Sequence, residues 1–190
     1  MLPLHTPRLI LRPFRAADAE ALAAYRADPE VAKYQSWAPS FTVLDAVVLI
    51  ADMGHIKLGQ PGEWYQVAIE ERATGVLVGD CALCVSAADD RQAEIGFTVA
   101  RPYQGQGFAG EAVGRLLDAL FVEFNLHRIQ AICDVDNHAS AKLLARLGFR
   151  REGHMVEHIW FKGRWASEYF FALLRREWAE ARAKKQETPP

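Results

Sequence analysis

The chain has no run of about 18 apolar residues, so we expect no membrane-spanning helix and no membrane partner. An excess of one charge is also missing, because the formal net charge is only −2 at pH 7. A strong basic excess is what attracts nucleic acids, so we expect no nucleic-acid partner. Near the start, Arg8, Arg12 and Arg15 interrupt any apolar stretch that a secretory signal would need. We therefore expect a cytoplasmic protein.

Cysteine is scarce, with three in 190 residues, which is too few for a disulfide framework. Cys81 and Cys84 form a C-x-x-C pair, but no second pair or nearby histidine cluster accompanies them. They lie in a strand-like segment, where their odd spacing predicts side chains on opposite faces. We interpret them as core or near-core residues in a reducing cytoplasm.

The six histidines lack the spacing of a metal site. His154 and His158 are four residues apart, but in a predicted strand, which would place them on one face about 13 Å apart. We therefore assign no metal.

Length and composition fit one globular domain, since 51% of the 190 residues are hydrophobic and 24% are charged. We expect a single domain over residues 1–180. Residues 181–190 end in Lys-Lys-Gln-Glu-Thr-Pro-Pro and are expected to form a frayed tail.

Apolar periodicity predicts a mixture of strands and helices. The expected strands cover residues 6–13, 64–70, 76–85, 92–99, 127–134, 149–161 and 164–174. The expected helices cover residues 16–26, 43–58, the segment with an apolar stripe over 109–124, residues 139–147, and the end of the chain from 175. This order predicts an α+β fold with a mixed, mostly antiparallel sheet of about seven strands flanked by helices.

The most informative segment reads Arg-Pro-Tyr-Gln-Gly-Gln-Gly-Phe-Ala-Gly-Glu-Ala over residues 101–112, between a predicted strand and a predicted helix. A glycine-rich turn at a helix N-terminus presents backbone N–H groups that bind phosphate. A Walker loop is excluded, because neither lysine nor serine or threonine follows Gly110. Gly105, Gly107 and Gly110 match a dinucleotide fingerprint in spacing, but no α/β repeat precedes them. A purely structural turn remains the alternative.

Four segments together resemble the GNAT-type N-acetyltransferases, within them the Rim-type branch that includes ribosomal-protein N-terminal acetyltransferases. They are Thr-Pro-Arg-Leu-Ile-Leu-Arg at 6–12, Glu-Ile-Gly-Phe-Thr-Val at 94–99, Gln-Gly-Gln-Gly-Phe-Ala-Gly-Glu-Ala at 104–112, and Asn-His-Ala-Ser at 137–140 followed by Arg-Leu-Gly-Phe at 146–149. Glu177 and Trp178 are also similar to this branch. Order and spacing make the match specific over most of residues 6–178.

The resemblance implies acetyl-CoA as the acyl donor and a splayed sheet that receives it. It implies a pyrophosphate grip by Gln104, Gly105, Gln106, Gly107, Phe108, Ala109 and Gly110. It also implies that the pantetheine arm pairs along Phe97, Thr98 and Val99, with a backbone N–H near Val99 for the oxyanion. Asn137 is expected either to bond the pantetheine amides or to be an ordinary helix N-cap.

Acetyl transfer to an amine needs a base for the amine proton. Glu94 is the first candidate, although it alternates with Ile95 and Phe97 and would also fit a solvated strand face. Asp80 is a weaker candidate, and Glu111 suits a helix N-terminus electrostatically.

The thiolate that leaves during acetyl transfer benefits from an acid. Many GNAT enzymes carry a tyrosine acid seven residues after the asparagine, and this chain has Leu144 there. Ser140 is expected to hydrogen-bond the cofactor's sulfur or arm, as a positioning group.

The acceptor is expected to bind against aromatic side chains, namely Tyr34, Trp37 and Trp160, by cation–π contact. Core packing is the competing interpretation for each.

We expect direct N-acetylation of a small-molecule amine or a protein N-terminus, with Cys133 the only cysteine near the site, in a monomer or homodimer. The alternatives are a non-catalytic acyl-CoA-binding regulatory module on the same fold and a nucleotide-binding protein that uses the glycine turn alone.

Overall fold

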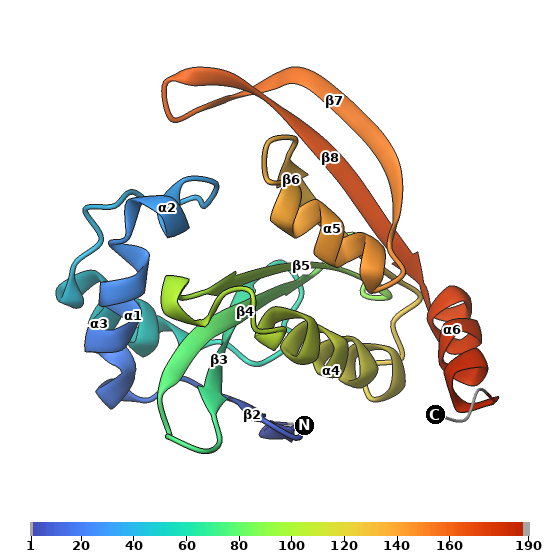
Figure 1. The fold of residues 1–190 in the computed structure, drawn as a ribbon, viewed down its shortest axis with the longest axis horizontal. Coiled ribbons are helices and arrows are strands. Elements are labelled where there is room, and N and C mark those ends of the chain that lie inside the picture. The colour runs from blue at the N-terminus through green and yellow to red at the C-terminus, as the bar shows by residue number, and fades with distance from the viewer. Residues whose placement is uncertain (1, 188–190) are drawn as a thin grey trace.

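The computed structural model describes residues 2–187 as one mixed sheet of eight strands with helices on both faces (Figure 1). The strand order is β1-β2-β3-β4-β5-β6-β8-β7, and each neighbouring pair is antiparallel except β5–β6. The strands are β1 (Leu4–His5), β2 (Leu9–Arg12), β3 (Trp64–Glu71), β4 (Leu77–Val85), β5 (Gln92–Val99), β6 (Arg128–Asp134), β7 (Arg150–Phe161) and β8 (Arg164–Leu174). The helices are α1 (Ala19–Arg26), α2 (Pro29–Ala32), α3 (Val43–Met53), α4 (Phe108–Val122), α5 (His138–Arg146) and α6 (Arg175–Glu187), with 3-10 helices η1 (Ala16–Asp18) and η2 (Arg101–Tyr103). The predicted α+β class with a mostly antiparallel sheet is confirmed.

Three boundaries differ from the prediction for local reasons. The first expected strand, residues 6–13, is shorter in the structure and covers only β2, because a turn at Thr6, whose hydroxyl accepts from the Leu9 N–H at 2.7 Å, separates it from β1, which was not expected. This adds an eighth strand. The expected loop before the second helix contains α2, where Asp28 accepts from the Glu30 N–H and Pro29 occupies the first turn. Helix α3 ends at Met53 rather than at residue 58, with Gly54 as its C-cap.

The two faces of the sheet carry separate apolar clusters. On one face, α4 buries an apolar stripe that includes Val113, Leu116 and Leu120 against the strands, and Leu144 of α5 joins the same cluster. On the other face, α1 and α3 pack through residues such as Leu22 and Ala46. Cys81 is buried and Cys84 is half-buried, which agrees with side chains on opposite faces of β4.

The sheet opens between β5 and β6. Their parallel pairing covers only three residue pairs and ends at Glu94 and Gln130. Beyond this point, called the fork below, residues 95–99 of β5 and 131–134 of β6 diverge, while each strand keeps its outer partner. The predicted splay is therefore present, and among residues 2–187 no strand pairs with the inner edges of residues 95–99 and 131–134.

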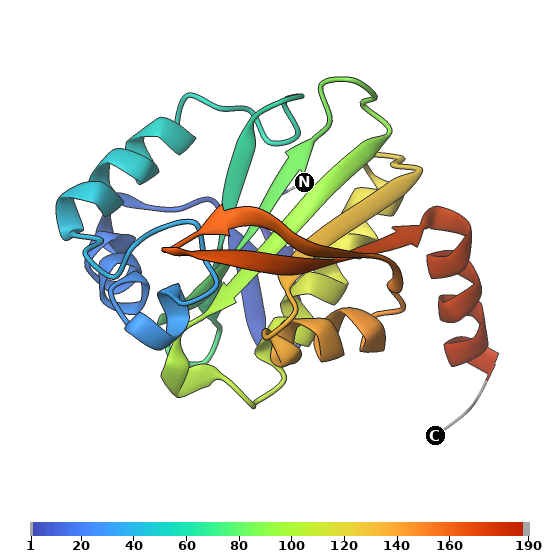
Figure 2. The same ribbon diagram turned by 90° about the horizontal axis from the view of Figure 1, so that it is seen from above.

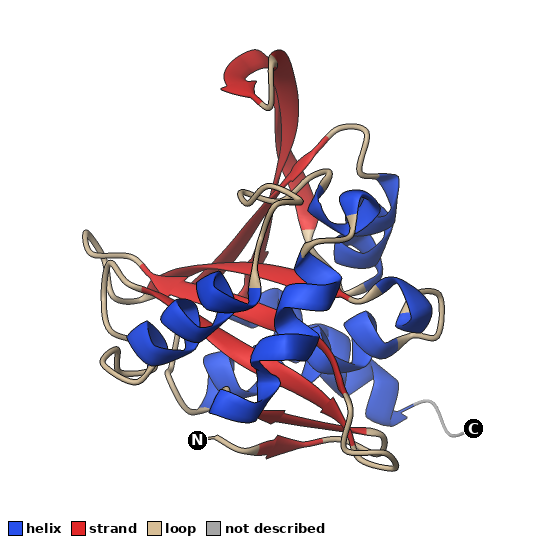
Figure 3. Ribbon diagram, turned by 90° about the vertical axis from the view of Figure 1, so that its left-hand side faces the viewer, coloured by secondary structure: helices blue, strands red, loops and turns tan. Residues whose placement is uncertain are grey.

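The β7–β8 hairpin extends past the layers of helix and sheet (Figure 3) and crosses above the sheet when seen from above (Figure 2). The register of its strands shifts between Met155 and Ile159. As a result, the His154 ring packs on Tyr169 while the His158 ring packs on Phe170, the next residue of β8. Because neighbouring strand residues point to opposite faces, the prediction that both histidines share one face is wrong.

The end of the chain continues as helix. Helix α6 includes residues 181–187 of the expected tail, and residues 188–190 lie outside the described residues. None of the helices formed by residues 2–187 combines the length and the apolar composition that crossing a bilayer requires.

Candidate active site

The glycine-rich turn, residues 104–110, is built to expose backbone N–H groups. Gly105 and Gly107 have φ angles of 75° and 82°, a left-handed region that favours glycine. Gly107 is the N-cap of α4, and within residues 2–187 no side chain caps this helix end. Its first N–H groups are therefore available to an anion, in line with the helix dipole. A Cβ at Gly105 would have no atom within 4 Å, so the turn borders open space.

Side-chain amides hold this turn against the end of β5. Gln104 Nε2 donates to the Val99 carbonyl at 2.8 Å, and Gln106 Nε2 donates to the Pro102 carbonyl at 2.9 Å. Both glutamine side chains therefore help to fix the loop. The structure thus gives these two residues a positioning role that their place in the motif did not reveal.

Glu111 ties the turn to the first strands. Its carboxylate accepts hydrogen bonds from the Thr6 hydroxyl at 2.6 Å and from the Arg8 backbone N–H and Nε at 2.9 and 2.6 Å. Burial alone would raise the pKa of Glu111, but these donors hold it below its usual value. The arrangement fits the expected electrostatic role at a helix N-terminus.

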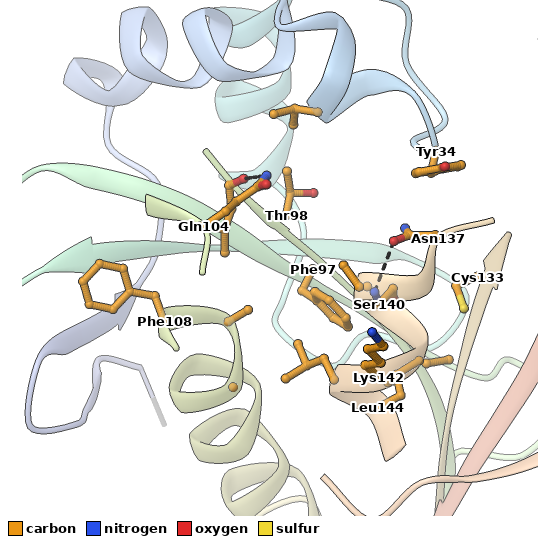
Figure 4. Close-up of a pocket in the computed structure, with 18 of the residues that line it drawn as sticks. Tyr34, Phe97, Thr98, Gln104, Phe108, Cys133, Asn137, Ser140, Lys142 and Leu144 are labelled. Atoms are coloured by element: carbon orange, nitrogen blue, oxygen red, sulfur yellow. Dashed lines mark hydrogen bonds between the residues drawn. The ribbon is translucent and has the colours of Figure 1, made fainter. Parts of the chain in front are cut away.

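A cavity of about 840 Å³ runs from the glycine turn into the fork. Its walls come from β5, β6, α5, the start of α4 and the region of α2 (Figure 4). Among the residues predicted to bind the cofactor, those that line it are Phe97, Thr98, Val99, Gln104, Gly105, Gly107, Phe108, Ala109, Gly110 and Asn137, and the catalytic candidate Ser140 lines it as well. Segments 40 residues apart in the chain thus meet around one opening.

Asn137 and Ser140 lie together at the start of α5. The Asn137 side chain accepts from the Ser140 N–H at 3.1 Å, so Asn137 is the N-cap (Figure 4). Cys133 of β6 lines the same cavity, and burial raises the pKa of its thiol to about 11 despite a hydrogen bond with Ser140. At neutral pH this cysteine is a protonated thiol and a poor nucleophile.

Other cavity residues escaped the sequence reasoning. Lys142 and Arg146 of α5 line the cavity and bring positive charge to it. Their spacing of four residues puts them on one helix face, which is the signal that could have found them. Leu144 is buried and lines the cavity at the position where the sequence resemblance leads us to look for a tyrosine acid.

The predicted bases lie away from this lining. Glu94 accepts a hydrogen bond from Gln130 Nε2 at 3.1 Å, across the last pair before the fork, and is not one of the described residues that line the cavity. Asp80 is buried beneath α1, where it accepts from the Tyr25 hydroxyl at 2.5 Å, and burial raises its pKa. Asp80 therefore has a structural role, since it joins β4 to α1 through Tyr25.

The three predicted acceptor residues have different surroundings. Tyr34 lines the cavity, and its hydroxyl donates to the Asp136 carbonyl at 3.2 Å. The guanidinium carbon of Arg26 lies 4.0 Å from the centroid of the Trp37 ring, so this ring already makes a cation–π contact within the chain. Trp160 is 61% exposed on the hairpin, outside the described cavity lining. The structure brings Tyr34, but not the two tryptophans, to the cavity wall.

Comparison with known proteins decides the family, because the model of the acetyltransferase (GNAT) domain matches residues 8–150. This chain belongs to the GNAT acetyltransferases. It is 36% identical to an uncharacterized N-acetyltransferase p20 from Bacillus licheniformis, over 94% of this chain and 99% of that protein. A spermidine N(1)-acetyltransferase from Vibrio cholerae is 39% identical over 40% of this chain and 43% of its own length. A GNAT acetyltransferase from Bacillus anthracis has a matching structure, with a TM-score of 0.81 and 28% identity over 93% of this chain and all of that one.

The predicted resemblance and the predicted class of enzyme are thereby confirmed: the chain is an N-acetyltransferase of the GNAT family. Nothing in the comparisons supports the non-catalytic module.

Proposed function

We propose that this GNAT enzyme uses acetyl-CoA and transfers its acetyl group directly to a primary amine. The observation that carries the proposal is the continuous cavity that joins the uncapped N-terminus of α4 to the free inner edge of β5. A ligand with a pyrophosphate at one end and an amide-bearing arm at the other matches these two features in order.

Backbone groups do most of the binding in this proposal. The N–H groups at the start of α4 bind the pyrophosphate, and the unpaired edge of β5 near Phe97–Val99 bonds the amides of the arm as an added strand would. Asn137 contributes from α5, and Lys142 and Arg146 favour a phosphorylated ligand electrostatically. Bound acetyl-CoA supplies an activated thioester.

Three groups of the chain serve the transfer. Glu94, which lies outside the described cavity lining, takes the proton of the acceptor ammonium through a bridging water molecule. A backbone N–H near Val99 stabilises the oxyanion that develops on the thioester carbonyl. Ser140 positions the cofactor sulfur. Burial raises the pKa of the Cys133 thiol to about 11, which makes it a poor nucleophile, so the neutral amine attacks the thioester carbonyl itself. A C–N bond forms, the C–S bond breaks, and the departing thiolate takes up the proton that the nitrogen loses.

We propose a small-molecule amine or a protein N-terminal amine as the acceptor. The name of the Vibrio cholerae relative supports a polyamine, and the Rim-type motifs support a protein N-terminus. An α-amino group with a pKa near 8 needs little help from a base, whereas an alkylamine near 10.4 depends on one. The two classes therefore differ in how strongly they require Glu94. Tyr34 is the proposed acceptor contact at the cavity wall, and Trp37 and Trp160 remain predictions.

The test is thiol release from acetyl-CoA with spermidine and with hexapeptides that begin with alanine or serine. We expect release with at least one of them, one thiol for each acetylated amine found by mass spectrometry. Cys133→Ala should keep this rate within about threefold, because the thiol takes no part. Binding of acetyl-CoA without release for any acceptor would favour the non-catalytic module, and a covalently acetylated Cys133 would refute direct transfer.

A further inference from the structure

The tip of the β7–β8 hairpin has an unusual residue. Lys162 and Gly163 form the two-residue turn between the paired residues Phe161 and Arg164, with φ angles of 49° and 82°. Positive φ at both positions favours asparagine and glycine, and a lysine at the first position is strained. The needs of the turn therefore do not explain why a lysine is here.

The contacts of the Lys162 ammonium group explain why a lysine occupies this turn position. Its Nζ donates to the Ala32 carbonyl at 2.5 Å and to the Trp37 carbonyl at 2.7 Å, across more than 120 positions of sequence. Ala32 is the last residue of α2, and a cation is favourable at a helix C-terminus. Among residues 2–187, both hydrogen-bond acceptors of this ammonium are carbonyl oxygens. Desolvation lowers the pKa of Lys162.

The segment that Lys162 holds is also a wall of the cavity. Loop 33–41 follows α2, and its residues Tyr34 and Gln35 line the cavity. On its other side the Tyr34 hydroxyl bonds the Asp136 carbonyl, in the turn between β6 and α5. The loop is thus fastened to the hairpin by Lys162 and to the β6–α5 turn by Tyr34. With these three hydrogen bonds, the hairpin, the loop and the β6–α5 turn form a closed ring beside the fork.

We propose that Lys162 determines acceptor specificity by keeping this ring closed. A closed ring admits an amine at the end of a small molecule or of an extended chain, and it excludes a lysine on the surface of a folded protein. This inference rests on the proposed acetylation of an amine at the fork, and it narrows the acceptor to slender molecules.

The first test is independent of acetylation. Lys162→Met keeps the length of the stem and removes the charge, Lys162→Arg restores a cation, and Lys57→Met removes a lysine from an exposed site after α3. Hydrogen exchange of loop 33–41 should become about tenfold faster in Lys162→Met than in the wild type. The arginine variant should recover protection at least in part, and the Lys57→Met control should not change. Unaltered exchange in Lys162→Met would overturn the ring.

The second test measures specificity by thiol release with spermidine, an N-terminal hexapeptide, and a small folded domain that has a blocked N-terminus and surface lysines. Lys162→Met should raise the KM of whichever small acceptor the wild type uses about tenfold and leave the KM for acetyl-CoA unchanged. Acetylation of the folded domain by the wild type as fast as that of the hexapeptide would refute the proposal. If the wild type releases no thiol with any acceptor, the proposed function fails, while the exchange experiment still decides whether the ring exists.

Discussion

Gly79 allows β4 and β5 to approach each other closely. A Cβ built on Gly79 would lie 2.1 Å from the Thr98 carbonyl oxygen and 2.9 Å from the Val99 Cα. These are backbone atoms of the strand that lines the cavity, so a side chain could be accommodated only if β4 and β5 moved apart. The close approach of the two strands therefore fixes where the free edge of β5 presents its hydrogen-bonding groups.

Gly79→Ala should lower the free energy of unfolding by about 1–3 kcal/mol, the usual cost of overpacking. It should also raise the KM for acetyl-CoA, because the displaced backbone is the proposed binding edge. Urea unfolding and initial-rate kinetics check the two effects. Gly153→Ala on β7 is the control, since its Cβ would meet the Phe170 Cβ at an ordinary 3.6 Å and Gly153 is outside the described cavity lining. Equal effects of the two substitutions would contradict this role of Gly79.

For single residues, the sequence predicts the role correctly where that role depends on local backbone conformation. The glycine spacing at 104–110 revealed the loop because positive φ and a following helix are local properties. Gly79 could not be found in this way, since its constraint comes from a neighbouring strand. The same holds for Trp37, whose aromatic face looked available until folding placed Arg26 over it.

The first strands and helices are joined by a buried ionic cluster. Arg12 of β2 binds both carboxylate oxygens of Asp18 in η1, at 2.7 and 2.8 Å, and donates through Nε to Glu70 of β3 at 2.6 Å. Arg12 is only 4% exposed. Burial by itself would raise the pKa of Asp18, but the bonds from Arg12 and Arg15 hold it below its usual value.

Asp18→Asn should destabilise the protein by about 3 kcal/mol, because Arg12 keeps its buried charge and loses half of its compensation. Since the pKa of Asp18 is lower in the folded than in the unfolded state, its contribution is complete above an unfolded pKa near 4 and disappears as pH falls through the folded value. The difference between wild type and variant in urea unfolding should therefore shrink in acid. A constant difference from neutral to acidic pH would contradict this assignment.

Whole elements were predicted well where periodicity was long. The stripe of α4 and the β3–β4–β5 meander follow from patterns of eight or more residues. The one-turn helix α2 has too few residues for a period, and the register shift in β7 arises from pairing with β8. That shift is why His154 and His158 lie on different faces, which no spacing rule within one strand can anticipate.

For the molecule as a whole, the fork is the feature that distinguishes this sheet from an ordinary mixed sheet, and it forms the proposed cofactor site. The sheet is interrupted at its single parallel pair, and the interruption lies between the N-termini of α4 and α5. The sequence predicted this splay through its resemblance to a family, not through strand propensity, because the register between strands far apart in sequence has no local signal. The proposed acceptor side involves Lys162 and loop 33–41, which meet only in the folded chain.

The most direct test of the account is calorimetric titration of acetyl-CoA into the wild type, Gly107→Val and Gly75→Val. Both glycines have positive φ, but Gly107 is at the N-terminus of α4 while Gly75 is in the β3–β4 turn, outside the described cavity lining. We predict that Gly107→Val weakens binding by at least about 30-fold, or about 2 kcal/mol, and that Gly75→Val binds like the wild type. Unchanged affinity in Gly107→Val, or an equal loss in both variants, would contradict the assignment of the glycine turn as the pyrophosphate site.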